Sequence, residues 1–287
     1  MIWFFLSLAA AISIAARDVS IKTYEGLDPP EIAILELFWA LPYFFFGSLL
    51  VEIPPLDQTF WWTFILSIPI NVVAYILYLY AIKISPISLS VPFLSFTPVF
   101  MILTSFFILA ETITIGGGIG IGFIVLGGYV LHFTNKQASL SEPLSAFLHE
   151  KGSWFMLIVA ILFAFAAVIG KKAILHSSPL FFSYFFFLIF NITVLTGFLL
   201  FRKNDWRKII RNTPRGIWLG SLLMVHISFH GLAIAISTAV YMVAVKRSSI
   251  LITVLLSWFI LKEENIRYRG LGSLLMFAGI LFITFLG

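Results

Sequence analysis

Two adjacent basic residues, Lys246 and Arg247, lie in the middle of an apolar stretch that runs from residue 237 to residue 261. They are its tenth and eleventh residues, and a helical rise of about 1.5 Å per residue places them about 15 Å from its start. That depth is near the centre of a bilayer, where charge is costly and usually functional. Adjacent helix positions point about 100° apart. We predict either that these cations bind a substrate in a cavity, or that they form a structural pair neutralised by a protein acid or by carbonyl groups.

Polar side chains at helical spacing in two other apolar stretches are further candidates for lining such a cavity. His226 and His230 are four residues apart and therefore share one helix face. Zinc would need at least a third protein ligand, and none is near in the sequence, so we expect no metal site. Asn71, Tyr75 and Tyr78 also share a face. These five residues line a substrate path, or else the histidines are hydrogen-bonded inside the bundle and the other three serve packing and interfacial anchoring.

Acidic residues at membrane depth are few. Glu36 lies about 9 Å into its apolar stretch. We expect it to be a counter-ion of Lys246 or Arg247, or a carboxylate that couples proton movement to transport. Asp18 is a second candidate for this role, although its place beside Arg17 and close to a membrane face favours an interfacial pair.

The composition sets the class of protein. Hydrophobic residues make up 61% of the chain and charged residues 11%, with a mean hydropathy of +1.06, against about 25% charged residues in soluble domains. The absence of cysteine excludes thiol catalysis and cysteine metal sites. A net charge of +5 reflects basic loops, so we expect no nucleic-acid partner. We find no nucleotide-binding or nucleophile motif, and we expect no cofactor and no enzymatic activity.

The apolar stretches predict an all-α polytopic membrane protein with ten transmembrane helices. A membrane-spanning helix needs about 20 mostly apolar residues, and ten stretches meet that requirement. The ten expected spans are residues 2–21, 30–51, 60–82, 87–110, 115–133, 154–175, 180–201, 217–234, 237–261 and 270–285.

The sequence contains an internal repeat. Residues 105–111 read SFFILAE and residues 257–263 read SWFILKE, with five of seven positions identical at an offset of 152. The repeat predicts a five-helix unit at 1–134, a connector at 135–152 and a second five-helix unit at 153–287. Because five is odd, the second unit must be inverted in the membrane, which is typical of secondary transporters. Three glycines repeat in the same register: Gly118, Gly120 and Gly127 match Gly270, Gly272 and Gly279.

Two further observations depend on this alignment. Tyr78 falls opposite His230. Lys22 and Lys172 occupy matching places, each seven residues before a proline near the end of a span. We expect both lysines to extend toward a membrane interface.

The distribution of basic residues predicts the orientation. Fourteen Lys and Arg residues belong to the face that carries the loops between spans one and two, three and four, five and six, seven and eight, and nine and ten, whereas two belong to the face of the termini. Cytoplasmic loops are enriched in Lys and Arg. Both termini are therefore expected outside the cytoplasm.

The segment from Thr97 to Gly128 resembles the EamA-type repeat of the drug/metabolite transporter superfamily. In that family a proline-containing span ends in a Leu-Gly-Glu-like motif before a glycine-rich span. Here the motif reads Leu-Ala-Glu at 109–111 and Leu-Lys-Glu at 261–263. The resemblance covers essentially the whole chain. It implies ten helices in two inverted repeats, a central cavity, and the export or exchange of amino acids, metabolites, sugars or drugs.

Two details qualify this resemblance, and a third extends it. Glu36 stands where the family often has an Arg, and the predicted external termini oppose the usual cytoplasmic ones. The Lys246-Arg247 pair is similar to the pair that binds phosphate in the related sugar-phosphate/phosphate translocators.

Together, these features predict an inner-membrane transporter that moves a small anionic or zwitterionic metabolite by alternating access. Its expected partners are that metabolite and the lipid bilayer, and a homodimer is compatible with the sequence. A lipid-carrier flippase and a sugar-phosphate/phosphate exchanger are the alternatives. An intramembrane enzyme built on His226 and His230 is disfavoured, because no nucleophile or third ligand accompanies them.

Overall fold

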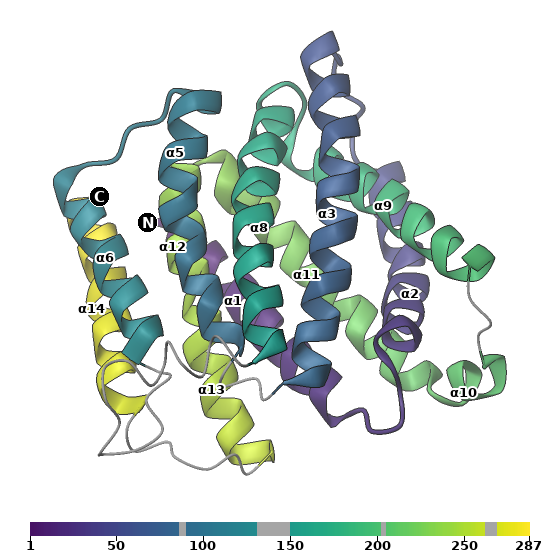
Figure 1. Ribbon diagram of the computed structural model, residues 1–287. Coiled ribbons are helices and arrows are strands. Elements are labelled where there is room, and N and C mark those ends of the chain that lie inside the picture. The colour runs from purple at the N-terminus through teal and green to yellow at the C-terminus, as the bar shows by residue number, and fades with distance from the viewer. Residues whose placement is uncertain (86–89, 131–149, 202–204, 262–268) are drawn as a thin grey trace.

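A computed structural model describes residues 1–85, 90–130, 150–201, 205–261 and 269–287. These residues form helices joined by short connections, with no strand among them (Figure 1). The helices are α1 (Ile2–Thr23), α2 (Pro29–Leu50), α3 (Gln58–Ile84), the 3-10 helix η1 (Val91–Phe96), α5 (Thr97–Leu109), α6 (Ile115–Val130), α8 (Lys151–Leu175), α9 (Pro179–Phe201), α10 (Trp206–Arg211), α11 (Thr213–Ala235), α12 (Ala239–Lys246), α13 (Ser248–Leu261) and α14 (Arg269–Leu286).

The predicted all-α class is confirmed. Within the described residues, seven helical segments are long and apolar enough to cross a membrane, and shorter apolar helices cover 93–109, 115–130 and 271–286. Two expected spans are divided differently from the prediction. Residues 90–109 form η1 followed by α5, and the stretch at 237–261 is interrupted at Arg247 between α12 and α13. The expected connector at 135–152 lies largely outside the described residues, as does the second Leu-x-Glu motif.

Local capping explains where several helices begin. Asp28 accepts a hydrogen bond from the backbone N–H of Glu31, and the Glu31 carboxylate accepts one from the N–H of Asp28. This capping box satisfies two of the backbone donors that a helix start leaves unpaired. Pro29, the first residue of α2, has no N–H to satisfy. Asp57 caps α3 in the same way through the N–H of Phe60.

The helices pack in corresponding pairs. α1 lies along α11 and α13, and α8 lies along α3 and α5. α6 pairs with α14 at one end of the molecule, and α2 packs against α9 and α11 at the other end (Figure 1). Many apolar side chains remain on the outside, including Phe107, which is 78% exposed. An apolar exterior of this kind is compatible with lipid rather than water around the helices.

Glycine allows the close approach of α6 and α14. A Cβ on Gly120 would lie 2.7 Å from the carbonyl oxygen of Gly279, and a Cβ on Gly279 would lie 2.5 Å from that of Gly120. A Cβ on Gly127 would lie 2.6 Å from the carbonyl oxygen of Gly272. The two contacts correspond to each other in the repeat: an offset of 152 residues relates Gly120 to Gly272 and Gly127 to Gly279. Small residues are what permit helix backbones to meet at such distances.

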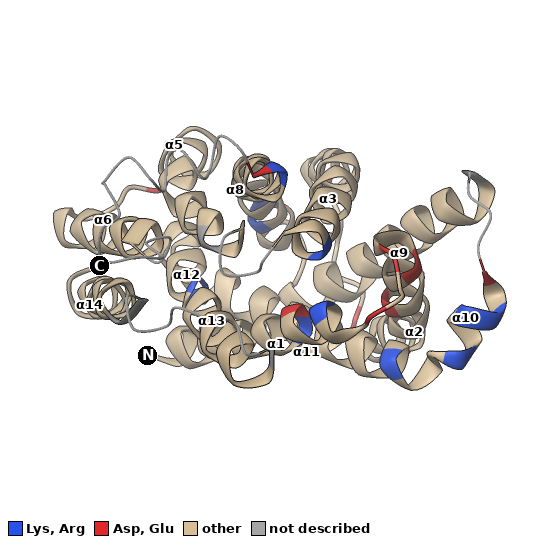
Figure 2. Ribbon diagram, turned by 60° about the horizontal axis from the view of Figure 1, so that its bottom comes forward, with Lys and Arg blue, Asp and Glu red and all other residues tan. Residues whose placement is uncertain are grey.

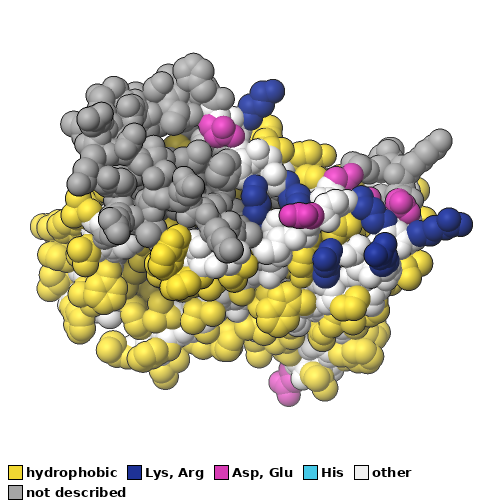
Figure 3. Space-filling view, turned by 90° about the horizontal axis from the view of Figure 1, so that it is seen from below, with side chains coloured by type: hydrophobic (Ala, Val, Ile, Leu, Met, Phe, Trp, Pro, Cys, Tyr) yellow, Lys and Arg dark blue, Asp and Glu magenta, His cyan; other side chains and the backbone are white. Residues whose placement is uncertain are grey.

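The two ends of the bundle differ in charge. We call "basic face" the end formed by the C-termini of α1 and α3, the start of α2 and the helix α10. Lys208 binds Glu31 there at 2.6 Å, and Lys83 donates to the carbonyl oxygen of Tyr24. Figures 2 and 3 show Lys and Arg gathered on this end, and Figure 3 shows apolar side chains around them. On the opposite face, the Thr114 hydroxyl donates to the carbonyl oxygen of Leu286, which places the C-terminus there.

Two lysine contacts, one in each half of the chain, correct one expectation. Lys22 donates to the carbonyl oxygens of Ile82 and Ser85, so it ties α1 to the end of α3. Its counterpart is Lys171, which donates to the carbonyl oxygen of Ser237. Ser85 and Ser237 are 152 residues apart. The predicted match of Lys22 with Lys172 was therefore wrong by one position, because α1 and α8 are offset by fewer residues than the rest of the repeat.

Candidate functional site

A cavity of about 170 Å³ lies between α1, α3, α8, α9, α11 and α12. It begins near the level of Arg17 and Tyr78 and reaches Ile174 and Ile234, near the last residues of α8 and α11. Those ends belong to the face opposite the basic face. Seven residues singled out from the sequence line the cavity: Asn71, Tyr75, Tyr78, His226, His230, Lys246 and Arg247.

The break between α12 and α13 positions the two adjacent cations. Arg247 is the C-cap of α12, and its N–H still donates to the carbonyl oxygens of Val243 and Ala244. The Lys246 Nζ lies 2.9 Å from Nδ1 of His230. Because an ammonium group has no acceptor capacity, this His230 nitrogen must accept.

Arg247 is buried, at 4% exposure, and donates from Nη2 to the Thr97 hydroxyl at 2.6 Å. Its Nε has no partner within the part of the chain that the structure describes. Neither Lys246 nor Arg247 forms an ion pair with a described carboxylate. The expectation that a protein acid neutralises one of them is therefore wrong for the described residues. Two adjacent cations in a cavity wall, without a carboxylate partner among the described residues, strongly attract an anion.

Glu36 is bound by a different cation from the one expected. The Arg17 guanidinium reaches across from α1 and donates from Nε to Oε1 and from Nη2 to Oε2, the latter at 2.7 Å. The Tyr75 hydroxyl donates to the same Oε2 at 2.6 Å. Glu36 has 0% exposure and is not part of the cavity wall. It is therefore not the counter-ion of Lys246 or Arg247.

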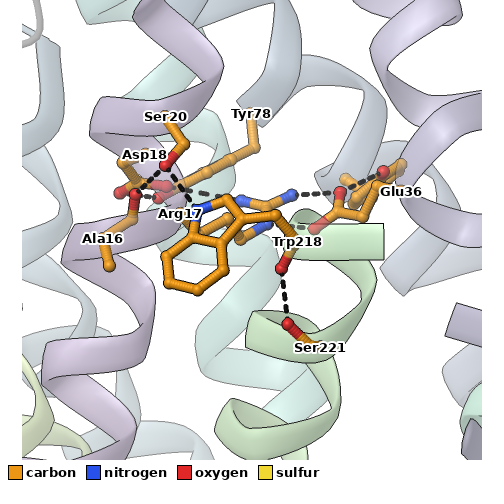
Figure 4. Close-up of polar contacts among 9 residues, drawn as sticks. Ala16, Arg17, Asp18, Ser20, Glu36, Tyr78, Trp218 and Ser221 are labelled. Atoms are coloured by element: carbon orange, nitrogen blue, oxygen red, sulfur yellow. Dashed lines mark hydrogen bonds and ion pairs between the residues drawn. The ribbon is translucent and has the colours of Figure 1, made fainter. Parts of the chain in front are cut away.

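Asp18 and Arg17 are also buried inside the bundle. Asp18 accepts from Arg17 at 3.3 Å and from the Tyr78 hydroxyl at 2.5 Å, and it is 1% exposed. Figure 4 shows Arg17 between the carboxylates of Asp18 and Glu36, with Tyr78 beside Asp18. The expected interfacial pair was wrong because these side chains turn into the bundle. Their network links α1, α2 and α3.

The two histidines lie side by side on α11. Their ring centroids are 5.9 Å apart in an edge-on arrangement, and Nε2 of His226 is buried with no described partner. No group of three or more potential metal ligands occurs within residues 1–85, 90–130, 150–201, 205–261 and 269–287. Both histidines form a polar part of the cavity wall beside Lys246.

The sequence interpretation overlooked an aromatic wall on α9. Phe182, Phe186 and Phe190 line the cavity at intervals of four residues. Their rings are stacked, with centroids 5.1 Å apart for the first pair and 6.2 Å apart for the second. The Tyr75 ring meets Phe190 edge-on at 5.7 Å. The spacing of these phenylalanines was visible in the sequence, but apolar residues in a membrane span give no signal that separates cavity wall from packing.

An ion pair and a contact between a carboxylate and a histidine lie on the face opposite the basic face. Lys171, which lines the cavity, binds Glu111 at the end of the SFFILAE motif. The same carboxylate accepts from the N–H of Ala239 and so caps α12. Nearby, Asp57 at the start of α3 lies 2.6 Å from Nδ1 of His176 at the end of α8. The Phe60 N–H and the His176 ring hold the pKa of the Asp57 carboxyl below its usual value.

The fold and the site define a multi-pass helical membrane protein with a small cavity in its bundle, lined by basic, polar and aromatic side chains. The model of the EamA-like transporter family matches the chain at residues 1–133 and again at residues 150–285. The chain belongs to the EamA-like transporter family, and members of this family are membrane transporters. This confirms the resemblance drawn from the Leu-Ala-Glu motif and its surroundings.

The fold also resembles a solved structure, described only as the crystal structure of a protein. It has a TM-score of 0.72 and 13% sequence identity, over 99% of this chain and 96% of that one. At this identity the likeness concerns the fold alone. A comparison with curated proteins finds no match.

Proposed function

We propose that this protein is a secondary transporter of the inner membrane that moves a small organic anion by alternating access through the central cavity. The observation that carries the proposal is the environment of Lys246 and Arg247. Both line the cavity, and neither has a described carboxylate partner. Unpaired charge at this depth is costly unless a ligand compensates it, so the pair is best explained as a binding site.

We further propose that ten helices form two inverted five-helix repeats, at 1–134 and 153–287. The paired contacts support this arrangement. α1 packs on α11 and α13 as α8 packs on α3 and α5, and the two contacts between α6 and α14 glycines are related by the offset of 152 residues. In such transporters the substrate site lies between the repeats, and access alternates when one repeat rocks against the other.

The contacts on the basic face favour a cavity that is closed on that side. Lys22 holds the end of α3 through the carbonyl oxygens of Ile82 and Ser85, and Trp218 of α11 donates to the Ser20 hydroxyl of α1 at 3.0 Å. We infer that these contacts separate when the cavity opens to the basic face. If that face is cytoplasmic, as its lysines and arginines predict, the structure corresponds to an outward-facing state.

Transport by purified protein in liposomes tests the proposal. Liposomes loaded with a panel of unlabelled carboxylates and phosphate esters should accumulate the labelled form of one of them by counterflow. Lys246→Met should abolish that uptake at normal protein level. Lys172→Met is the matched control, because Lys172 is a half-buried lysine outside the cavity wall, and it should leave uptake unchanged. Undiminished counterflow by Lys246→Met would contradict the proposed role of this residue.

A further inference from the structure

The charges buried around the cavity do not cancel. Arg17, Lys246 and Arg247 line it, and the two carboxylates at the same depth are Asp18 and Glu36. With both carboxylates ionised and both histidines neutral, three cations face two anions, so one net positive charge remains. Lys171 and Glu111 neutralise each other separately near the cavity's end. A ligand with a single negative charge would make the total charge of these five side chains and the ligand zero.

The same contacts leave no carboxylate to neutralise a positive charge on the ligand. No Asp or Glu appears among the described residues that line the cavity. Glu36 is held on both oxygens by Arg17 and Tyr75, and Asp18 is held by Arg17 and Tyr78. An ammonium group on the ligand would therefore lose its water and gain no carboxylate, while it faces Lys246 and Arg247. Burying a charge without a partner is strongly unfavourable.

The cavity wall also offers hydrogen-bond donors that an anion could use. The Arg247 Nε is buried and has no described partner, and the Lys246 ammonium has three protons but only one hydrogen-bond partner, His230, among the described residues. The Nε2 of His226 is also buried without a described partner, and it donates when it carries the ring proton. A carboxylate has two oxygens and about four lone pairs, which suits such a small set of donors.

The aromatic wall indicates the chemistry of the part of the ligand that carries no charge. Phe182, Phe186 and Phe190 form a stacked series along the cavity, and Tyr75 and Phe163 line it as well. Rings of this kind favour flat, aromatic surfaces in offset or edge-on contact. A cavity of about 150 Å³ is large enough to hold benzene, and this one, at about 170 Å³, has room for one ring beside its charged end.

We propose that the cavity binds an aromatic monocarboxylate and rejects the corresponding α-amino acid. The carboxylate lies against Lys246 and Arg247, and the ring lies against the phenylalanines of α9. This inference rests on the proposed function only in that the cavity is taken to be the substrate site. It narrows the proposed organic anion to one with a single carboxylate, an aromatic ring and no ammonium group.

Four probes that differ in one group test the proposal on purified wild-type protein in detergent. 3-Phenylpropanoate carries the ring and the carboxylate, and L-phenylalanine adds an α-ammonium group to the same skeleton. 2-Phenylethylamine lacks the carboxylate, and butanoate lacks the ring. We expect calorimetric and thermal-shift titrations to show 3-phenylpropanoate binding about tenfold or more tighter than each of the other three. Lys246→Met should remove this binding, and Lys172→Met should retain it.

Two results would overturn the inference: L-phenylalanine binding as tightly as 3-phenylpropanoate, or no binding of 3-phenylpropanoate by folded wild-type protein. The comparison of probes on wild-type protein stands even if a variant fails to fold. Counterflow separates this inference from the proposed function. Binding of 3-phenylpropanoate without transport of any anion would support the proposed binding site and contradict the proposed transport function. Transport of a different anion, without binding of 3-phenylpropanoate, would support the transport function and contradict the proposed ligand.

Discussion

Arg17 and Glu36 form a buried ion pair that joins α1 to α2, with the guanidinium placed against both carboxylate oxygens. The pair is asymmetric, because Arg17 also binds Asp18 whereas Glu36 has Arg17 as its only described basic partner. Removal of Arg17 therefore leaves two buried carboxylates without a cation. Removal of the Glu36 charge leaves Arg17 with Asp18.

We predict that Arg17→Met destabilises the protein more than Glu36→Gln does. Breaking a buried pair by removal of one partner costs about 3–5 kcal/mol, and Arg17→Met should lie at or above that range. The double variant Arg17→Met/Glu36→Gln should recover part of the loss. Thermal unfolding in detergent measures the order of these effects.

Lys208→Met provides the control for this series. It breaks the pair with Glu31 at the basic face, where the Lys208 side chain is 36% exposed. Such a pair contributes about 0–1 kcal/mol, so this variant should unfold close to the wild-type temperature. A Glu36→Gln variant less stable than Arg17→Met would show that Asp18 does not share the guanidinium.

The place of Lys246 in a cavity wall was predictable from the sequence, but the partner of Glu36 was not. The position of Lys246 midway along an apolar stretch follows from counting residues, and helical spacing likewise placed His226 and His230 on one face. The contact of Arg17 with Glu36 crosses between helices, and its geometry depends on how α1 rotates against α2. Net apolar composition carries no information on that rotation. Residues with several possible partners, such as these few charges, are therefore the least predictable part of the site.

The internal repeat shows the same difference: the residue offset is visible in the sequence, whereas the contacts depend on how the helices pack. The register of 152 residues in SFFILAE correctly relates Ser85 to Ser237. It misplaces the lysine partner, because Lys171 rather than Lys172 binds the Ser237 carbonyl oxygen. The break of the ninth span at Arg247 had no sequence signal, since neither Gly nor Pro marks it.

We predict that Lys246→Met does not destabilise the protein, although it removes ligand binding. Lys246 has no described carboxylate partner and lies beside another cation, Arg247, so its charge opposes folding. An apolar side chain of similar length should increase the free energy of unfolding by an amount on the order of 0.5–2 kcal/mol, and the unfolding temperature should rise with it. Stability and function would then change in opposite directions at one residue. A clear fall in the unfolding temperature of Lys246→Met would instead indicate a structural role for the contact with His230.

Gly279 and Gly122 give a matched pair for the packing of α6 and α14. A Cβ on Gly279 meets the carbonyl oxygen of Gly120 at 2.5 Å, and backbone atoms cannot move aside as a flexible side chain can. We predict that Gly279→Ala destabilises the protein by about 1–3 kcal/mol. Gly122→Ala meets nothing within 4 Å, and the higher helix propensity of Ala should leave stability unchanged or slightly increased. Equal effects of the two substitutions on the unfolding temperature would contradict the close contact.

The orientation of the chain can be measured directly, because it contains no cysteine that would compete for a label. Arg211 is exposed on α10 at the basic face, and Glu52 is exposed in the connection between α2 and α3 on the opposite face. The basic residues on the side of Arg211 predict that it is cytoplasmic. In intact cells, an impermeant thiol reagent should therefore modify Glu52→Cys and spare Arg211→Cys, and after lysis it should modify both. The reverse pattern would place the termini in the cytoplasm, as is usual in the family, and would make the cavity open toward the cytoplasm in this structure. The labelling result thus also decides which side of the membrane supplies the ligand to the state described here.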